Sequence, residues 1–348
     1  MRYAPQLFCR RSCCLAILLL SLLIFPLGCH ARQEHIITGR TMGTTYHITV
    51  VSGYFKGVGN LKDRIDARLE EVNQSMSTYL PDSEISRFNS FEQVGVKFPI
   101  SPDFFQVLQV GQKLFQLSKG AWDATVQPLV DLWGFGPTFK ERKLPRPEEI
   151  AAVLPEIGFD HIELIAPNFL VKKIAGITLD LSSIAKGFGV DQVAKVIEQN
   201  GFEDYLVEIG GEIFAAGLRS DGKAWRIGIN RPQPDAPADE VYKVVSLSDR
   251  AFATSGDYRN FFEAGGVRYS HVLDPKTGYP VSNGVVSVSV LAESCTFADG
   301  LATTLMVMGP EKGLELVNKL DKVECLIVVQ KPDGSLADYY SPGFRVDD

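Results

Sequence analysis

The sequence predicts an α+β fold in which helices pack against mixed β-sheets. Segments with a helical repeat of apolar residues and segments rich in β-branched residues follow one another in the chain. They lack the regular strand–helix–strand order that is typical of a doubly wound sheet. With 348 residues, the chain is long enough to bury the core of one large domain or of two small ones.

Helices are predicted where apolar residues recur every three or four positions. In the first of them, Leu61, Ile65 and Leu69 share one face. A second helix begins after Ser101, a favourable N-cap, and ends at Gly120. The predicted helices cover residues 61–77, 102–118, 124–132, 147–154, 185–200, 294–308 and 310–319, with one further helical turn inside the loop 78–90.

Strands are predicted where β-branched and aromatic residues alternate with polar ones or form short apolar runs between turn residues. They cover residues 35–40, 44–51, 162–165, 170–173, 176–179, 205–208, 212–217, 225–229, 241–246, 251–254, 268–273, 284–291 and 324–330. Residues 135–146 are rich in Gly, Pro and charge, which indicates a surface loop. The proline-rich stretch 231–238 is more typical of a long loop within one domain than of a linker.

The N-terminus has the pattern of a bacterial lipoprotein signal peptide. Arginines near the start are followed by an apolar stretch over 14–26, which is too short for a comfortable membrane span. Gly28 before Cys29 is typical of the cleavage site, after which Cys29 would carry the lipid. Ordinary secretion and an uncleaved N-terminal anchor are the alternatives.

This pattern predicts a signal peptide over residues 1–28 and a single domain over 29–348. We expect the domain to be lipid-anchored in the bacterial cell envelope and to face the periplasm; the choice between inner and outer membrane stays open. In the mature chain only Cys295 and Cys325 would be left beside Cys29. They could pair in an oxidising compartment or stay as two buried thiols.

Charge argues against nucleic acid as a partner. The full chain has a formal net charge of −7, and the predicted leader contains three arginines and no acidic residue, so its removal makes the chain more acidic. An acidic surface does not attract polyanions over long range. Any phosphate site must therefore be local and helped by a cation.

The run from Thr178 to Asp191 gathers features that suit such a phosphate site. We expect a short apolar strand to end at Asp180 and to lead through two serines into a helix that begins near Lys186. A carboxylate, backbone carbonyls, a lysine and a helix N-terminus would then share one small volume. This arrangement suits a phosphate with its metal ion.

Three short motifs could instead indicate a penicillin-binding protein. They are S-x-x-K at 183–186, Y-x-N at 258–260 and K-T-G at 276–278. In that class K-T-G lies on a strand, whereas here Pro275 and Pro280 flank it and predict a turn. Nearly half the chain also precedes the serine, so we reject this interpretation.

Asp299 and Thr303 are the clearest candidates for a metal site. They are four residues apart and would lie on one face of a helix. A carboxylate and a hydroxyl at this spacing are oxygen ligands of the kind that Mg²⁺ prefers. The alternative is structural: Asp299 offsets the helix dipole while Thr303 bonds back to a carbonyl.

His271 is a candidate general base, because it ends a predicted strand close to acidic residues. The alternative is a structural histidine. Gly210 and Gly211, followed by Glu212, could let the backbone approach a ligand closely, or could simply form a hairpin turn.

These signals fall into one family pattern. The chain resembles the bacterial FAD:protein FMN transferases, the ApbE family, over roughly residues 35–340. The resemblance rests on eight blocks in order: TMGTTY (41–46), MSTYLPDSEISRFN (76–89), GAWDAT (120–125), DLSSIAKG (180–187), EIGGE (208–212), ATSG (253–256), HVLDPKTG (271–278) and ADGLAT (298–303). Any one block is short, but eight in order are highly specific. The resemblance implies an ApbE-like fold of two closely associated subdomains.

The resemblance also implies a reaction and its residues. Such enzymes cleave FAD, move its FMN half onto a Thr or Ser hydroxyl of another exported or membrane-bound flavoprotein, and release AMP, with Mg²⁺ as cofactor. His271 matches the histidine that assists the acceptor hydroxyl. The main-chain carbonyl of Ser183, with Asp299 and Thr303, matches the Mg²⁺ site. Positions expected to contact FAD are Met42, Tyr79, Ala121, Trp122, Asp123, Asp180, Lys186 and Leu273.

Two other functions stay open beside the transferase. The same metal site could serve an FAD pyrophosphatase that releases FMN and AMP. The chain could also be a non-catalytic lipoprotein that binds FAD. The acceptor protein and the oligomeric state cannot be predicted from the sequence.

Overall fold

The computed structural model describes residues 32–136, 144–237, 240–257 and 260–347. The predicted signal peptide over 1–28 and the predicted lipidation site Cys29 lie outside these residues. So does most of the predicted loop 135–146.

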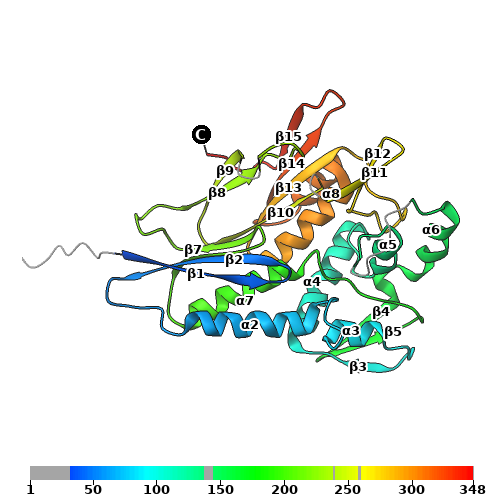
Figure 1. Cartoon of the computed structure of the whole chain (residues 1–348), viewed down its shortest axis with the longest axis horizontal. Helices are drawn as coiled ribbons and strands as arrows, with labels where there is room; N and C mark the ends of the chain where they lie inside the picture. Colours follow the sequence, from blue (N-terminus) through cyan, green and yellow to red (C-terminus); the bar gives the residue numbers. More distant parts are fainter. Residues whose placement is uncertain (1–31, 137–143, 238–239, 258–259, 348) are drawn as a thin grey trace, which may run out of the picture.

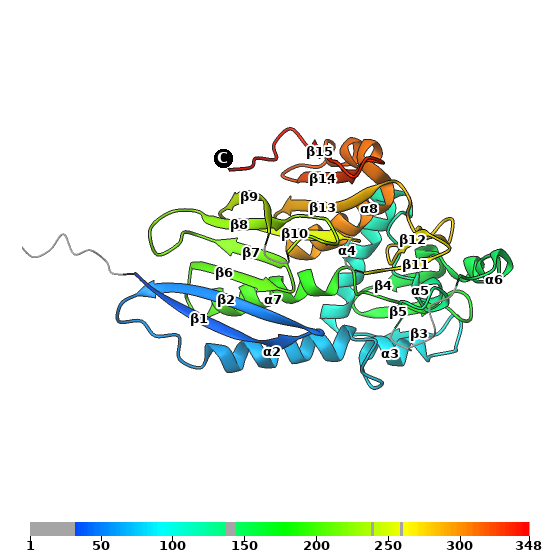
Figure 2. The same cartoon turned by 45° about the horizontal axis from the view of Figure 1, so that its top comes forward.

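An eight-stranded sheet forms the centre of the molecule (Figures 1 and 2), with the strand order β1-β2-β6-β7-β10-β13-β14-β15. All neighbouring strands in it run antiparallel, which confirms the α+β class. The strands are β1 (Arg32–Thr41), β2 (Thr44–Gly53), β6 (Asp204–Ile209), β7 (Glu212–Ala216), β10 (Arg250–Gly256), β13 (Val285–Ala292), β14 (Glu324–Gln330) and β15 (Leu336–Tyr340).

Helices cover one face of this sheet (Figure 1). They are α2 (Leu61–Met76), α4 (Pro102–Ser118), α7 (Ala185–Gln199) and α8 (Cys295–Val317). Helix α7 packs on β6 and β7, α8 packs on β10, β13 and β14, and α2 and α4 pack against α7 and α8. The apolar faces predicted for residues 61–77 and 185–200 are buried in this layer, as Leu61 and Val193 show. Among the described residues, no helix is both long enough and apolar enough to cross a bilayer.

A two-stranded hairpin of β8 (Trp225–Asn230) and β9 (Val241–Leu247) covers part of the opposite face. Its Trp225, Ile227 and Val245 form a second buried cluster with Phe252 and Leu326 of the large sheet. Since β8 and β9 pair directly, the described proline-rich residues 231–237 lie in the connection of a hairpin, as expected of a loop within one domain.

Smaller elements build the end of the molecule beside α4 (Figure 2). They are α3 (Glu84–Asn89), β3 (Lys97–Pro99), β4 (Ile162–Ile165), β5 (Phe169–Lys172), α5 (Gln127–Leu132), α6 (Pro147–Val153), β11 (Phe261–Ala264), β12 (Val267–Ser270) and two 3₁₀ turns over Leu154–Glu156 and Phe159–His161. Buried Trp133 lies at the centre of an apolar cluster that joins α5 and α6 to Leu273. Its ring packs against Phe262 of β11 and Tyr269 of β12.

The strand predicted over 176–179, which was expected to end at Asp180, is absent: these residues form an irregular segment. The Asn89 side chain explains the difference. Its Nδ2 donates to the Leu179 carbonyl at 2.9 Å, and its Oδ1 accepts from the Leu179 amide at 2.8 Å. A side chain therefore satisfies the backbone groups that a neighbouring strand would have bound.

Two other predicted boundaries were wrong. The helix predicted from 124 begins only at Gln127, because the Asp123 carboxylate holds the Thr125 amide and hydroxyl in a turn before it. The strand predicted over 268–273 ends at Ser270, after which the His271 amide donates to the Asn260 carbonyl. Residues 275–277 form a turn, which confirms the reason for rejecting the K-T-G motif.

The two predicted C-terminal helices are the two halves of α8. Gly309 separates them with φ 77° and ψ 175°, a conformation outside the helical region that glycine adopts at little cost. Cys295 lies in α8 and Cys325 in β14, and both are buried free thiols, so the unpaired alternative holds.

Asp191 of α7 binds the start of α8. Its carboxylate accepts from the Ser294 hydroxyl and the Cys295 amide at 2.8 Å, and from the Thr296 amide at 2.9 Å. The Thr296 hydroxyl donates to it as well. A carboxylate here satisfies amides that a helix N-terminus leaves without partners, and it opposes the positive end of the helix dipole.

We expect Asp191→Ala to destabilise the protein by about 2–4 kcal/mol, because several buried donors lose their acceptor at once. The measurement is urea denaturation followed by far-ultraviolet circular dichroism. Asp191→Asn keeps the shape and one acceptor oxygen, so it should lie between the wild type and the alanine variant. An unchanged midpoint in Asp191→Ala would contradict this role.

Candidate functional site

Two adjoining cavities of about 490 and 660 Å³ lie where the irregular segment before α7 meets the large sheet and α8. Both volumes fall in the range of small-molecule sites, about 300–1,000 Å³. The residues that line both cavities are Thr78, Tyr79, Asp180, Ser182 and Lys186. Every residue that the sequence predicted for catalysis, FAD contact or metal binding lines one or both of them.

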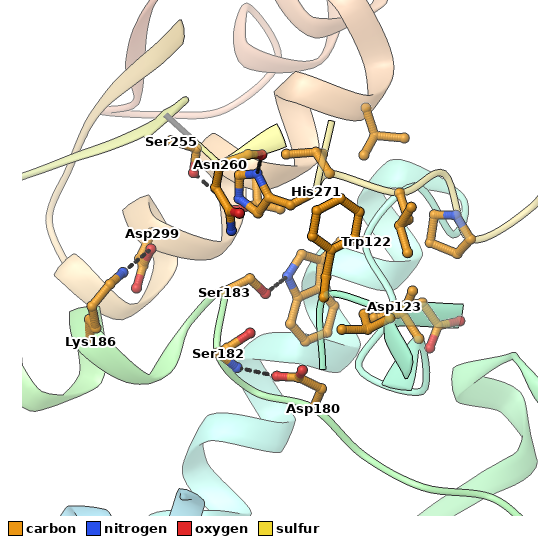
Figure 3. A pocket seen from close by; sticks show the side chains of 18 of the residues that line it. Trp122, Asp123, Asp180, Ser182, Ser183, Lys186, Ser255, Asn260, His271 and Asp299 are labelled. Atoms are coloured by element: carbon orange, nitrogen blue, oxygen red, sulfur yellow. Dashed lines mark hydrogen bonds and ion pairs between the residues drawn. The ribbon is translucent and has the colours of Figure 1, made fainter. Parts of the chain in front are cut away.

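Asp180 lies at the junction of the two cavities. Its Oδ1 accepts from the Ser182 amide at 2.6 Å (Figure 3). The Asp180 amide donates to the Ala124 carbonyl at 2.7 Å. Burial raises the pKa of the Asp180 carboxyl, and the bonds from Ser182 only partly offset this effect. The backbone around Asp180 is therefore fixed although it is not a strand.

Lys186, in the first turn of α7, reaches two carboxylates. Its Nζ is 3.1 Å from Glu212 Oε1 and 3.8 Å from Asp299 Oδ1 (Figure 3 shows the latter pair). Burial alone would lower the pKa of Lys186, but Asp299 and Glu212 outweigh it and raise the pKa above its usual value. Lys186 is therefore a permanent positive charge at the cavity wall.

Asp299 is held in place by α7. Its Oδ2 accepts from the Gly187 amide at 2.9 Å, and its side chain is 3% exposed. A Cβ on Gly187 would clash with the Cys295 carbonyl, so only glycine allows α7 and α8 to approach this closely. Burial raises the pKa of Asp299, against the opposing effect of Lys186.

The structural alternative was that Asp299 offsets the dipole of α8 and that Thr303 bonds back to a helix carbonyl. The contacts at the start of α8 do not fit it. Asp191, and not Asp299, binds the amides at the N-terminus of α8. The Thr303 hydroxyl lies 2.9 Å from the Ser255 hydroxyl of β10, whereas the hydroxyl that bonds back to a helix carbonyl belongs to Thr304. Both predicted metal ligands therefore present oxygen atoms at the cavity.

The donor set fits a hard cation. The Gly187 amide, which would bind the Ser183 carbonyl in a regular helix, donates to Asp299 instead. The Ser183 hydroxyl accepts from Trp122 Nε1 at 3.0 Å, so the side chain is tied to Trp122 (Figure 3). A carbonyl, a carboxylate and a hydroxyl oxygen are the ligand types of Mg²⁺. Within the described part of the chain, no cluster of three or more His, Cys, Asp or Glu side chains could hold a metal.

The segment 121–123 forms another wall of the first cavity. Ala121 and Trp122 are buried, and the Trp122 ring packs near Phe159. Asp123 Oδ1 accepts from Thr125, and Asp123 Oδ2 accepts from the Phe159 amide at 3.0 Å. The Asp123 carboxylate thus holds Thr125 and Phe159 in place beside the cavity, while residues 121–123 themselves line it.

His271 faces the same cavity from the end of β12 (Figure 3). Its Nδ1 donates to the Asn260 carbonyl at 3.0 Å. Because a carbonyl can only accept, the neutral ring carries its proton on Nδ1 and its lone pair on Nε2. Leu273, two residues on, is buried and pairs with Pro280 in an isolated bridge, which fixes the segment that carries His271.

Met42 and Tyr79 are the predicted residues of the second cavity. Met42 occupies the tight turn between β1 and β2 with φ 48°. Tyr79 is 74% exposed and lines both cavities. An exposed aromatic ring at the junction is available to stack on a planar ligand.

Glu212 is the residue that the sequence reasoning missed. In the sequence it is only the residue after two glycines, yet in the structure its side chain is 4% exposed and it pairs with Lys186. Its Oε2 has no hydrogen-bond partner among the described residues. Burial raises the pKa of Glu212 to about 8, although Lys186 acts in the opposite direction. A carboxylate beside a Gly-Gly pair in the EIGGE block was the available signal.

We expect Glu212 to make the ligand-free protein less stable as the pH rises. Its pKa is about 8 in the folded chain against a usual value of 4.5, so the folded state holds a proton that unfolding releases. Stability then falls as the pH rises between these values. The test compares melting temperatures of wild type and Glu212→Gln across this range, without FAD and with a chelator. The advantage of the variant should grow with pH; a constant difference would contradict the assignment.

The chain matches the ApbE family over residues 42–327. It is 45% identical over 333 residues to an FAD:protein FMN transferase of Vibrio cholerae, covering 94% of this chain and 97% of the relative. It is 44% identical over 297 residues to one of Haemophilus influenzae, covering 84% and 86%.

Solved structures agree with the sequence comparison. The flavin transferase ApbE of Vibrio cholerae matches with a TM-score of 0.82 at 44% identity, covering 90% of this chain and 98% of that one. The apo form of the flavinyl transferase ApbE of Pseudomonas stutzeri matches with a TM-score of 0.80 at 37% identity, covering 89% and 95%. Sequence and fold agree, and the chain belongs to the ApbE family.

Proposed function

We propose that this protein is an FAD:protein FMN transferase that moves the FMN half of FAD to a Thr or Ser hydroxyl of an exported or membrane-bound flavoprotein and releases AMP. One observation carries the proposal. Two cavities meet at Lys186, with Asp299 and His271 on the wall of one of them. A dinucleotide has two bulky halves joined by a pyrophosphate, which fits two cavities with a cation at their junction.

Ser183, Asp299 and Thr303 would hold Mg²⁺ through a carbonyl, a carboxylate and a hydroxyl oxygen. When bound, Mg²⁺ neutralises charge on the pyrophosphate oxygens as a Lewis acid. Glu212 Oε1 pairs with the Lys186 ammonium and would keep it directed at the pyrophosphate. Glu212 Oε2 is buried and has no hydrogen-bond partner among the described residues. Lys186 adds its charge to the positive end of α7, so an acidic protein can hold an anionic substrate locally.

His271 would take the proton from the acceptor hydroxyl. With Nδ1–H bound to the Asn260 carbonyl, Nε2 carries the lone pair that can accept a proton. The acceptor oxygen forms a bond to the FMN phosphorus, the phosphoanhydride bond breaks, and AMP leaves with the electron pair. The product is a phosphodiester between FMN and the acceptor. The nucleophile in this reaction is the acceptor hydroxyl, and the Ser183 hydroxyl accepts a hydrogen bond from Trp122.

We also propose that Cys29 is lipidated and holds the protein at the envelope membrane, facing the periplasm. The basic and apolar leader before Gly28 supports this proposal. A membrane-bound enzyme would meet a membrane-bound acceptor without a long diffusional search.

The test incubates the protein with FAD, Mg²⁺ and a candidate acceptor domain, and then examines the acceptor on a denaturing gel under ultraviolet light. We expect a fluorescent acceptor band, AMP released in equal amount, and an acceptor mass increased by FMN less one water. Substituting the acceptor Thr or Ser by Ala should remove the band.

Two alternative functions give different results in the same assay. AMP and free FMN without a labelled acceptor would indicate an FAD pyrophosphatase. FAD binding without either product would indicate a non-catalytic binding protein. Either result, repeated over several acceptor domains, would contradict the proposed transfer.

A further inference from the structure

Two aromatic side chains project from the loop after β2. Phe55 is 98% exposed and Tyr54 is 66% exposed, and their rings contact each other edge to face with centroids 5.3 Å apart. Folded proteins seldom leave adjacent aromatic rings this open, because burying a Phe side chain stabilises by about 1.5–3 kcal/mol. Such a pair therefore indicates a surface that a membrane or another molecule covers.

The pair lies at the end of the molecule where the described chain begins. Arg32, the first residue of β1, pairs with Gly53, the last residue of β2, so Tyr54 and Phe55 follow directly. Figures 1 and 2 both place this loop and the start of β1 at the left end, away from α6 and the β11–β12 hairpin.

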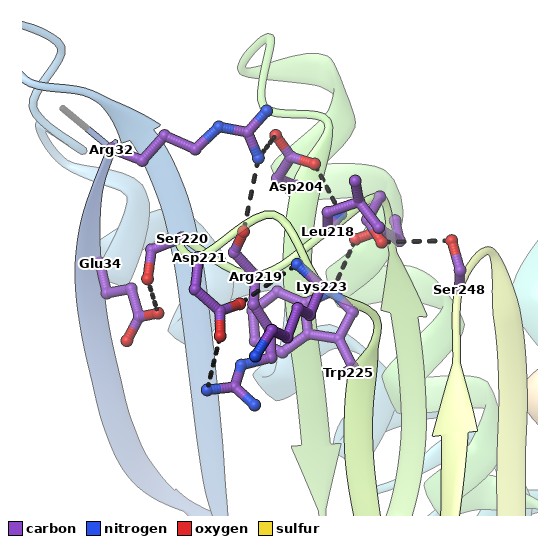
Figure 4. Close-up of polar contacts among 12 residues, drawn as sticks. Arg32, Glu34, Asp204, Leu218, Arg219, Ser220, Asp221, Lys223, Trp225 and Ser248 are labelled. Carbon is purple, nitrogen blue, oxygen red and sulfur yellow. Dashed lines mark hydrogen bonds and ion pairs between the residues drawn. The ribbon is translucent and has the colours of Figure 1, made fainter. Parts of the chain in front are cut away.

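A second exposed apolar residue of this end comes from the loop between β7 and β8. Leu218 is 37% exposed, and its amide donates to Asp204 Oδ1 at 2.7 Å (Figure 4). Arg32 connects this loop to the start of β1, because it donates to the Arg219 carbonyl and pairs with Asp204, both at 3.4 Å. The network fixes Leu218 beside the N-terminal strand.

The loop that carries Tyr54 and Phe55 is also fixed by hydrogen bonds. The Ser52 hydroxyl donates to the Lys56 carbonyl at 2.6 Å, and Lys56 Nζ donates to the Gly201 carbonyl at 2.5 Å. Both ends of the Tyr54–Phe55 segment are thereby tied to the body of the protein. The two rings therefore project from a turn that hydrogen bonds fix on both sides.

The loop that carries the two rings, residues 53–60, contains Lys56 and has no acidic residue. In the neighbouring loop, Asp221 pairs with Arg219 at 3.6 Å, so the acid there is neutralised. Aromatic rings flanked by basic residues are typical of segments that lie at the interface of a membrane.

We propose that Tyr54, Phe55 and Leu218 enter the headgroup region of the bilayer that holds the lipid of Cys29. Cys29 stands three positions before Arg32, so three residues can separate it by at most about 10 Å from the Arg32–Gly53 pair. This proximity selects the membrane as the occupant over a second protein. The inference rests on the proposed lipid anchor and is independent of FMN transfer.

The test uses the full processed chain in vesicles of phosphatidylethanolamine and phosphatidylglycerol. Phe55→Cys is labelled with an environment-sensitive fluorophore, and lipids with a spin label near the headgroup serve as quenchers. Cys295 and Cys325 are buried and should not react in the folded protein. Val267→Cys in β12, where Val267 is 53% exposed, is the matched control. Mass spectrometry of the N-terminal peptide reports the lipid.

We expect a blue-shifted probe at position 55 that headgroup spin labels quench several-fold more than the probe at position 267. Equal, water-like emission at both positions on a lipidated chain would overturn the inference. A blue shift without vesicles would also overturn it, because it would indicate contact with protein. An unmodified Cys29 with an unquenched probe would remove the anchor and this inference together. FMN transfer, measured in detergent, should stay at the wild-type rate in Phe55→Cys whichever result is obtained.

Discussion

Asp299→Ala should lower FMN transfer by about 10³-fold or more while the protein stays folded. The substitution removes the only carboxylate of the predicted Mg²⁺ site and the acceptor of the Gly187 amide. A lost metal ligand costs several kcal/mol of charge stabilisation in the transition state, and each 1.4 kcal/mol is about tenfold in rate. The rate is measured as acceptor fluorescence over time at a series of Mg²⁺ concentrations.

Two variants separate the metal from the fold. Asp299→Asn can still accept from Gly187, so it should keep more stability than Asp299→Ala but recover little activity. Glu84 is the matched control, because it is a buried carboxylate that accepts from Ser75 and Ser101 away from both cavities. Glu84→Gln should keep its Mg²⁺ dependence. Near-normal turnover in folded Asp299→Ala would contradict the metal assignment, and a loss of folding would favour a structural role.

His271→Ala should lower transfer by about 10²–10⁴-fold, the usual contribution of a general base. FAD affinity should change little, because the variant lacks the group that takes the proton of the acceptor hydroxyl, and not a group that binds FAD. The wild-type rate should rise with pH, since only the neutral ring can accept a proton. The variant should lack this rise. Rates and FAD binding are measured across the same pH series.

His47 provides the control for this experiment. Its side chain is 60% exposed and contacts Glu208 on the outer surface, so His47→Ala should keep the wild-type profile. Wild-type rates in His271→Ala at every pH would remove the general-base role. A loss of FAD binding in that variant would instead make His271 a substrate contact.

Helices with a long apolar repeat could be predicted from the sequence closely. The boundaries of α2, α4 and α7 agree with the predicted ones within one residue or so, because a repeat of three and four positions over 15 residues or more has no other good solution. The cap at Ser101 was also found, since its side chain accepts from the Phe104 amide as expected.

Short segments were predicted unevenly: the strand over 162–165 is confirmed as β4, but other short segments were wrong or missed. Residues 176–179 are as apolar as a strand, but a distant side chain, Asn89, binds their backbone. The edge strand β15 and the short strands β3 and β11 were missed, because three to five residues carry too little pattern. These elements depend on tertiary partners that only the folded chain brings together.

The residues of the site could be predicted from the sequence blocks, but the contacts between their side chains could not. Asp180, Lys186, His271 and Asp299 do lie on shared cavities, although long stretches of chain separate them. Glu212 escaped notice because its importance comes from burial against Lys186, and burial is not visible in a five-residue motif. Asp191 could not be predicted either, because its partners lie about 100 residues further along the chain.

The length of the β1–β2 ladder has a consequence for the choice of acceptor. The ladder spans ten residues in each strand, from Arg32 paired with Gly53 to Thr41 paired with Thr44, and ends at Met42 on the cavity wall. At roughly 3.3 Å per residue it is a rigid spacer of about 30 Å. If one end lies at the bilayer as proposed, the other end would hold the FMN donor at a fixed height. A membrane protein would then qualify as an acceptor by how far its Thr or Ser stands above the lipid, as well as by the residues around it.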